Sequence, residues 1–93
     1  MDTATFQAEL KRDDFNDIET KSQPANRFNA AHSHPFEVRL LVTAGEATLV
    51  FNGTTRTYRA GDILTMAPGC EHTEQYGPAG WTYIVGKKYP QAA

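Results

Sequence analysis

Three histidines are the residues of this chain whose types and spacing suit chemistry. His32 and His34 lie one residue apart, and His72 follows the turn signal Ala67-Pro68-Gly69. On an extended strand, side chains two residues apart point to the same face, so the imidazoles of the pair share one side. A third imidazole brought to that side makes a transition-metal site. The spacing therefore predicts a fold that carries His72 to the pair.

Glu74 is the carboxylate that we expect beside this site as a catalytic residue. It lies two residues after His72, so a regular strand places both side chains on one face. Three roles are open to it: a fourth metal ligand, a general acid or base above a metal-bound substrate, and a hydrogen-bond partner that orients an imidazole. The alternative is a hydrated charge at the mouth of the fold, unconnected to the metal.

Cys70 is the only cysteine, which excludes an internal disulfide and suits a reducing compartment. It lies two residues before His72, in the predicted turn. We interpret it as a small buried apolar group rather than a nucleophile.

Composition limits the class of protein. A chain of 93 residues, 40% apolar and 22% charged, is one ordinary globular domain. Its net charge of −2 argues against a nucleic-acid partner. No apolar run reaches the ~18 residues of a membrane span, and no signal peptide is visible. We expect a cytoplasmic protein without a membrane partner, and a homodimer because small β-domains gain burial by pairing.

The elements that must position the histidines are mostly strands. A short helix is predicted over residues 3–13, with Phe6 and Leu10 at helical spacing and Thr3 or Thr5 as its cap. Strands are predicted over residues 16–22, 37–42, 46–51, 54–59, 63–66, 72–76 and 81–86. Asn52-Gly53 is a two-residue hairpin signal. Short strands separated by frequent turns indicate an all-β sandwich or barrel.

Two motifs in the chain resemble those of the cupin superfamily. The first reads His32-x-His34, then Glu37, then Gly45, and the second reads Gly61, five residues, Ala67-Pro68-Gly69, two residues, His72. The second motif keeps the family spacing from glycine to histidine, although its proline has moved one place. The resemblance covers residues 18–86 and implies a cupin-type jelly-roll β-barrel. We divide the chain into an N-terminal helical segment (1–16), the barrel (17–87) and a C-terminal tail (88–93).

The resemblance also implies a metal site with one departure from the family pattern. His32, His34 and His72 match the ligand histidines, and Glu37 is the candidate for the ligand glutamate. Counting back six residues from Gly45 nevertheless gives Val38, and strand alternation turns Glu37 to the opposite side from His34. A bulge before the strand would turn Glu37 back towards the metal. Arg39 shares the parity of Glu37, which predicts an outward salt bridge for it.

The expected cofactor is a divalent transition metal ion, namely Fe, Ni, Zn, Mn, Co or Cu. Three neutral imidazoles leave such a site at +2, which favours a small anionic ligand in an otherwise apolar barrel. We expect some of Phe36, Leu40, Met66, Tyr76 and Tyr83 to line that cavity. One hypothesis is a metal-dependent isomerase, lyase or dioxygenase acting on a small organic acid or carbonyl compound. The alternatives are a non-catalytic sensor or accessory protein that binds a metal or small molecule, and a structural jelly roll with packed histidines.

Overall fold

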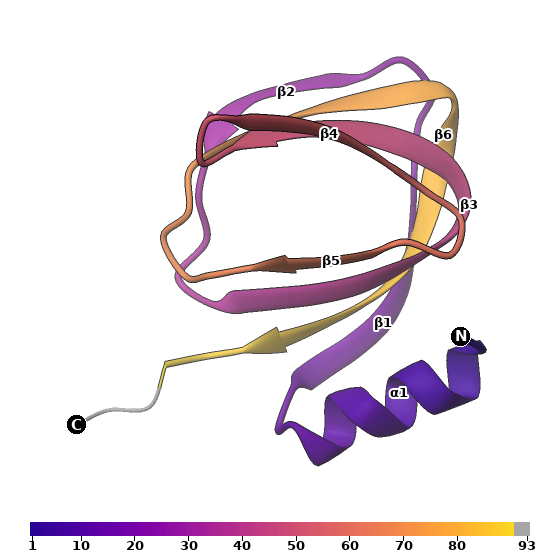
Figure 1. Cartoon of the computed structure of the whole chain (residues 1–93), viewed down its shortest axis with the longest axis vertical. Coiled ribbons are helices and arrows are strands. Elements are labelled where there is room, and N and C mark those ends of the chain that lie inside the picture. Colours follow the sequence, from indigo (N-terminus) through magenta and orange to yellow (C-terminus); the bar gives the residue numbers. More distant parts are fainter. Residues whose placement is uncertain (91–93) are drawn as a thin grey trace.

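A computed structural model describes residues 1–90 as one helix and six strands (Figure 1). No helix within these residues is long and apolar enough to cross a membrane. Of the tail predicted from residue 88, residues 91–93 lie outside the described part. The elements are α1 (Thr3–Arg12), β1 (Asn16–Gln23), β2 (Phe28–His32), β3 (Glu37–Phe51), β4 (Thr54–Arg59), β5 (Ile63–Met66) and β6 (His72–Lys88).

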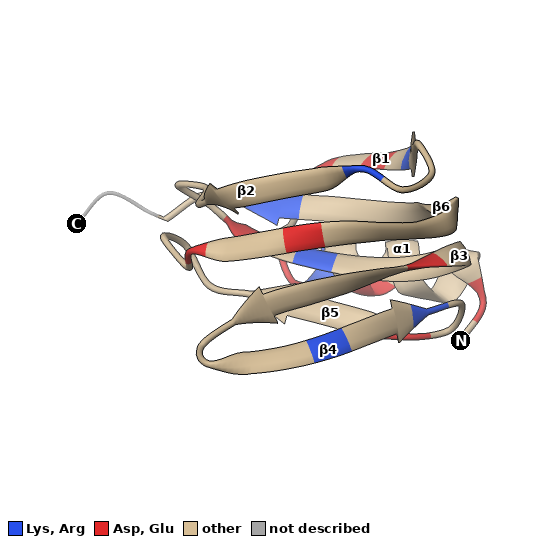
Figure 2. Cartoon of the chain, turned by 90° about the horizontal axis from the view of Figure 1, so that it is seen from above, with Lys and Arg blue, Asp and Glu red and all other residues tan. Residues whose placement is uncertain are grey.

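The two long strands, β3 and β6, run antiparallel through both layers of the barrel. The second half of β3 pairs with β4 and with the first half of β6, which also pairs with β2. The first half of β3 pairs with β5 and with the second half of β6, which also pairs with β1. Seen from above, β2, β6, β3 and β4 lie side by side (Figure 2). These pairings and the mostly β content confirm the predicted cupin-type architecture.

The strands predicted over 37–42 and 46–51, and over 72–76 and 81–86, are continuous, so the breaks predicted between them are wrong. Gly45 and Gly80 have φ values of 70° and 68°, and the ladder between β3 and β6 slips beside Gly45. Glycine adopts positive φ at little cost, so the strands bend without leaving the sheet. A side chain on Gly45 would collide with the carbonyl oxygen of Gly80. The barrel therefore turns its corner where the two glycines meet.

Helix α1 covers the outer face of the layer that contains β1 and the second half of β6. Its cap is Asp2 rather than Thr3 or Thr5, because the Asp2 carboxylate accepts from the Thr5 amide at 2.8 Å. The helix contributes the predicted Phe6 and Leu10 to a buried group, which we call the outer cluster: Phe6, Leu10, Phe15, Leu41 and Ile84. This cluster fixes the layer that forms one wall of the cavity.

The predicted hairpin at Asn52-Gly53 is confirmed. Both residues have positive φ (51° and 71°), and Phe51 pairs with Thr54 across the turn. The type I′ geometry needs positive φ at both central positions, which asparagine and glycine tolerate best.

Candidate metal centre

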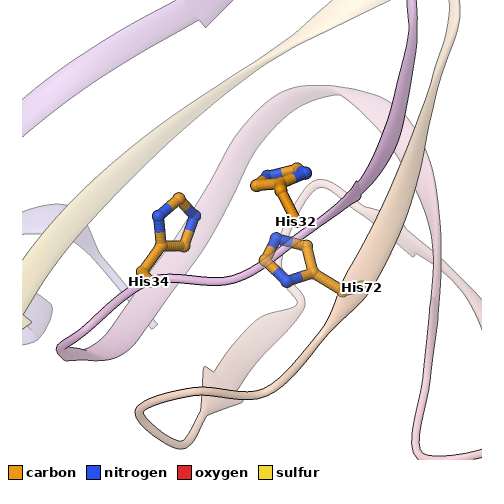
Figure 3. Close-up of side chains that lie close together, drawn as sticks. All are labelled: His32, His34 and His72. Atoms are coloured by element: carbon orange, nitrogen blue, oxygen red, sulfur yellow. The ribbon is translucent and has the colours of Figure 1, made fainter.

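The structure brings the three histidines together where β2 ends and β6 begins (Figure 3). His32 and His72 are direct partners in the β2–β6 ladder, and their ring centroids lie 4.3 Å apart. The His34 ring lies 5.2 Å from the ring of His32 and 5.3 Å from that of His72. The amide of Gly69 donates to the carbonyl of His34 at 2.8 Å, which ties the loop before His72 to the loop of the His-x-His pair.

Backbone carbonyls fix the tautomers of two of the rings. Nδ1 of His32 lies 2.8 Å from the Ala30 carbonyl, and Nδ1 of His72 lies 3.0 Å from the Cys70 carbonyl. A carbonyl oxygen only accepts hydrogen bonds, so each Nδ1 carries the proton and donates it. In the neutral ring, Nε2 is then a bare acceptor. A backbone bond at Nδ1 is the usual way to orient an imidazole whose Nε2 binds a metal.

Glu74 points at these two bare nitrogens. Its Oε2 lies 3.1 Å from Nε2 of His72 and 3.4 Å from Nε2 of His32. Its Oε1 accepts from Asn29 at 3.3 Å and from the Tyr76 hydroxyl at 3.1 Å, and Asn29 also donates to Tyr76 at 2.8 Å. Lone pairs of two nitrogens and a carboxylate that converge on one point repel each other unless a proton or a metal ion lies between them. The donor set therefore fits a metal ion.

Burial and neighbouring charges shift two groups at the site. Burial is the main cause that lowers the pKa of His34, and the nearby His72 and His32 rings lower it further. A lowered pKa keeps this imidazole neutral at pH 7, which is the form that binds metals. Burial, and then the negative charge of Glu74, raise the pKa of Tyr76 to about 12. Tyr76 therefore stays a hydrogen-bond donor to that carboxylate.

Glu37 is not brought to the histidines. It opposes Lys88 in the β3–β6 ladder, and Val38 lines the cavity in its place. The ladder runs without a bulge from Glu37 to Val42, so alternation turns Glu37 to the outer side. Arg39 shares that side and forms the expected outward salt bridge, 2.6 Å from Asp13.

Cys70 is half-buried and packs against the hydrophobic cluster inside the barrel, which includes Leu49, Tyr58 and Met66. It acts on the site through its backbone carbonyl, which holds the His72 ring. Its thiol lies 3.8 Å from the Asn52 side chain, at the distance of a weak sulfur hydrogen bond.

The histidines open into a cavity of about 330 Å³ inside the barrel. All five residues predicted as lining candidates lie in its wall. The sequence interpretation missed five further polar or aromatic wall residues. Strand alternation from Tyr83 gives a signal for two of them, Trp81 and Lys87, whereas the other three are placed only by the pairing of distant strands. The predicted and the missed wall residues are Phe36, Leu40, Met66, Tyr76 and Tyr83, and Lys21, Gln23, Asn29, Trp81 and Lys87.

Trp81 has a polar atom without a partner. Its side chain is 4% exposed, and its indole Nε1–H meets no acceptor within residues 1–90. A buried donor left unpaired costs about 1–3 kcal/mol of stability. In the wall of a cavity, this donor is available to a ligand or to a bound water.

Comparison with known proteins identifies the family. The sequence model of the AraC-like ligand-binding domain matches residues 17–86, so the chain belongs to that family. A search of curated proteins finds no match.

Several solved structures share the fold. A conserved protein of unknown function from Streptococcus pyogenes is 20% identical over 81% of this chain and 65% of its own, with a TM-score of 0.68. A cupin protein from Bacteroides fragilis is 18% identical over 82% of this chain and 67% of its own (TM-score 0.65). The DMSP lyase DddQ from Ruegeria pomeroyi is 22% identical over 82% of this chain and 39% of its own (TM-score 0.70). These likenesses confirm the cupin fold, and the chain spans about two thirds or less of each relative.

Proposed function

Starting from membership of the AraC-like ligand-binding family, we propose that this domain binds a small organic anion through a divalent transition metal ion. The metal is held by one ring nitrogen each of His32, His34 and His72. The small molecule occupies the cavity of about 330 Å³ into which these rings open. Imidazole ligands suit Zn, Fe, Ni, Co and Cu, and Mn is the weakest binder among the metals considered.

One observation carries this proposal: the backbone carbonyls leave Nε2 of His32 and His72 bare and facing Glu74 at 3.4 and 3.1 Å. A proton on Nε2 would also satisfy Glu74, but a metal ion is the occupant that uses the third ring, His34, as well. The bound metal supplies a Lewis acid that attracts and polarises an oxygen of the ligand. The chain's own residues orient the rings and enclose the ligand.

Charge around the cavity favours an anion. Lys21 and Lys87 are in the wall, and Glu74 is the one acidic residue among the lining residues. Lys87 also lies over the Phe36 ring at 5.0 Å, and that ring stacks on His34, so one lysine stands at the histidine end. With a metal of charge +2, the wall carries a net positive charge, and interactions in an apolar enclosure are stronger than in water.

Metal titration tests the proposal with a matched pair of variants. We expect Zn²⁺, Co²⁺ or Ni²⁺ to bind one ion per chain and to raise the melting temperature. His72→Ala should weaken binding by more than ~100-fold, which exceeds the loss usual for an outer-shell residue. Glu37→Gln should leave metal affinity unchanged, because its side chain lies outside the cavity. Metal binding that survives His72→Ala, or that is lost in Glu37→Gln, would contradict the assignment.

A second candidate function is metal-dependent catalysis by Glu74, in an isomerase, lyase or dioxygenase. The specific observation is the carboxylate itself, which Asn29 and Tyr76 hold beside the two bare nitrogens. Because both Nδ1 atoms are bonded to the backbone, Glu74 is free to act as a fourth ligand or as a proton acceptor.

Glu74→Gln separates catalysis from binding. Metal-loaded protein should be assayed with thiols, β-diketones, α-keto acids and uronic sugars. Catalysis predicts turnover of one of these compounds and a loss of at least ~100-fold in Glu74→Gln. Absence of turnover in wild-type protein, with metal bound, leaves ligand binding as the function.

A further inference from the structure

The cavity has a second polar end. By register, Gln23 opposes Trp81 and Lys21 opposes Tyr83, and all four side chains line the cavity. Trp81 also opposes Gly45, where β3 and β6 bend. In Figure 1 this bend lies across the barrel from the end of β2, which is His32. The four residues form a second polar end, which we call the far end. Tyr76 links it to the histidine centre, because its ring lies 5.9 Å from the Trp81 ring and its hydroxyl donates to Glu74.

The far end holds donors that nothing in the described chain uses. The Trp81 indole N–H is buried and has no acceptor. The Tyr83 hydroxyl oxygen accepts from the Gln23 amide at 3.1 Å, and its own hydrogen has no acceptor within residues 1–90. Gln23 thus occupies the acceptor side of this oxygen and leaves the O–H free to donate. Lys21 adds a positive charge, and its ammonium group forms an ion pair with the Glu19 carboxylate at 3.3 Å.

One part of the cavity wall is apolar, and Tyr76 and Asn29 form a polar part beside it. Side chains that carry no hydrogen-bonding group form the apolar part: Val38, Leu40, Leu49, Leu64, Met66 and Val85. A ligand that is polar along its whole length, such as a sugar, would lose hydrogen bonds to water here without replacement. The cavity suits a molecule that is polar at both ends and apolar between them.

We propose that the far end is a second carboxylate subsite, so that the ligand class is a small α,ω-dicarboxylate. This inference rests on the proposed function, because one carboxylate binds at the histidine centre near Lys87. The other accepts from Trp81 Nε1–H and the Tyr83 hydroxyl beside Lys21. The methylene chain contacts the leucines and Met66. At ~30 Å³ per water molecule, the cavity holds about eleven waters, which corresponds to a ligand of roughly eight to eleven non-hydrogen atoms.

The two donors at the far end, the Trp81 N–H and the Tyr83 O–H, suit a carboxylate, whose oxygens have lone pairs for both. Hydrogen bonds to an ionised acceptor are roughly twice as strong as those between neutral groups. Lys21 adds a partly exposed positive charge, which its ion pair with Glu19 at 3.3 Å reduces.

Calorimetry on metal-loaded protein tests the inference with matched pairs of probes. Succinate, glutarate and adipate are compared with butyrate, pentanoate and hexanoate. We expect at least one dicarboxylate to bind about 10-fold or more tightly than its monocarboxylate partner. Trp81→Phe and Tyr83→Phe should each remove most of this preference, while monocarboxylate affinity and metal uptake change less than about 2-fold. Tyr89→Phe, which removes an exposed hydroxyl next to Phe36, is the control and should preserve the preference.

The outcomes separate this inference from the proposed function. Metal uptake without any preference for dicarboxylates overturns the far-end subsite alone. A preference that persists in both aromatic variants overturns the assignment of its donors. If either variant fails to fold, Lys21→Met replaces it, because Lys21 is more exposed than the two aromatic residues. This variant should weaken dicarboxylate binding and leave monocarboxylate binding unchanged. Failure of the wild-type protein to take up metal overturns both proposals.

Discussion

The two faces of one layer of the barrel differ in how completely they are closed. On β3 and β6, Leu41 and Ile84 point outward into the outer cluster, which α1 covers. Their neighbours Leu40 and Val85 point inward and line the cavity. Both faces belong to the same two strands with the same backbone hydrogen bonds, and both carry aliphatic side chains. The outer face is a packed core, whereas the inner face surrounds a space.

The polar groups differ in the same way. At the outer face, the Arg39 guanidinium is paired with Asp13 at 2.6 Å and lies over the Phe15 ring at 4.5 Å. At the inner face, two imidazole nitrogens face a carboxylate, and the Trp81 N–H has no partner among residues 1–90. The outer pair is partly exposed, at 25% and 30% of its side chains, whereas Trp81 is 4% exposed and the His72 side chain 2%. Polar groups that face a space without a protein partner mark the inner face as the candidate site, because a ligand or bound water can compensate their cost there.

Truncation of adjacent leucines gives the largest effect that separates the two faces. Leu41→Ala should lower the free energy of unfolding by about 3–5 kcal/mol, because it opens a void in a packed cluster. Leu40→Ala should cost at least ~1 kcal/mol less, because its side chain borders a space and has fewer partner atoms to lose. Denaturant unfolding measures both. An equal or larger cost for Leu40→Ala would show that the inner face is packed as tightly as the outer one.

Alkaline pH should reveal the inner face through Tyr76. Its pKa in the folded protein is about 12, above the ordinary value of 10.0. A raised pKa gives stability that is complete below pH 10 and is lost as the pH rises towards 12, because the unfolded chain releases the proton first. The loss is at most about 3 kcal/mol, because each pKa unit corresponds to ~1.4 kcal/mol. We expect Tyr76→Phe to flatten the dependence of the free energy of unfolding on pH between about pH 9.5 and 11.5. A profile that stays as steep in the variant would exclude Tyr76 as its cause.

Acid should lower the stability of the outer face by protonating Asp13. We expect the smallest of the three effects here, because Asp13 and its arginine partners contact water. Hydrogen bonds from Arg12, and then from Arg39, hold the pKa of Asp13 below its ordinary value of 3.8. A lowered pKa gives stability that is present above pH 3.8 and is lost as the pH falls through the folded value. Asp13→Asn should reduce the acid dependence of the melting temperature. An unchanged acid profile would mean that the pair contributes nothing measurable.

Local spacing was sufficient to predict how the site is assembled. The His-x-His spacing and the distance from Gly61 to His72 predicted that three imidazoles gather, and the structure brings them together. The strand expected under the pair ends at His32, so His34 lies in the loop that follows. Strand alternation likewise predicted that Val38, and not Glu37, faces the cavity unless a bulge intervenes, and the ladder has none there.

The remaining features depend on contacts between distant parts of the chain. In the sequence, Gly45 and Gly80 look the same as glycines at a turn where the chain reverses. Only the pairing of β3 with β6 shows that each is a bend within a continuous strand. The places of Lys21 and Gln23 depend on the register between β1 and β6, about sixty residues apart in sequence, which no local pattern encodes.

The most direct test of the central claim is an anomalous-difference map from crystals grown with Zn²⁺ or Co²⁺. We expect one strong peak about 2.0–2.1 Å from Nε2 of His32 and of His72 and from one ring nitrogen of His34. The same map locates Glu74 relative to the ion, within about 2.2 Å if it is a ligand. A peak at other residues, or no peak between these three rings at saturating metal, would contradict the claim that the histidines form a metal centre.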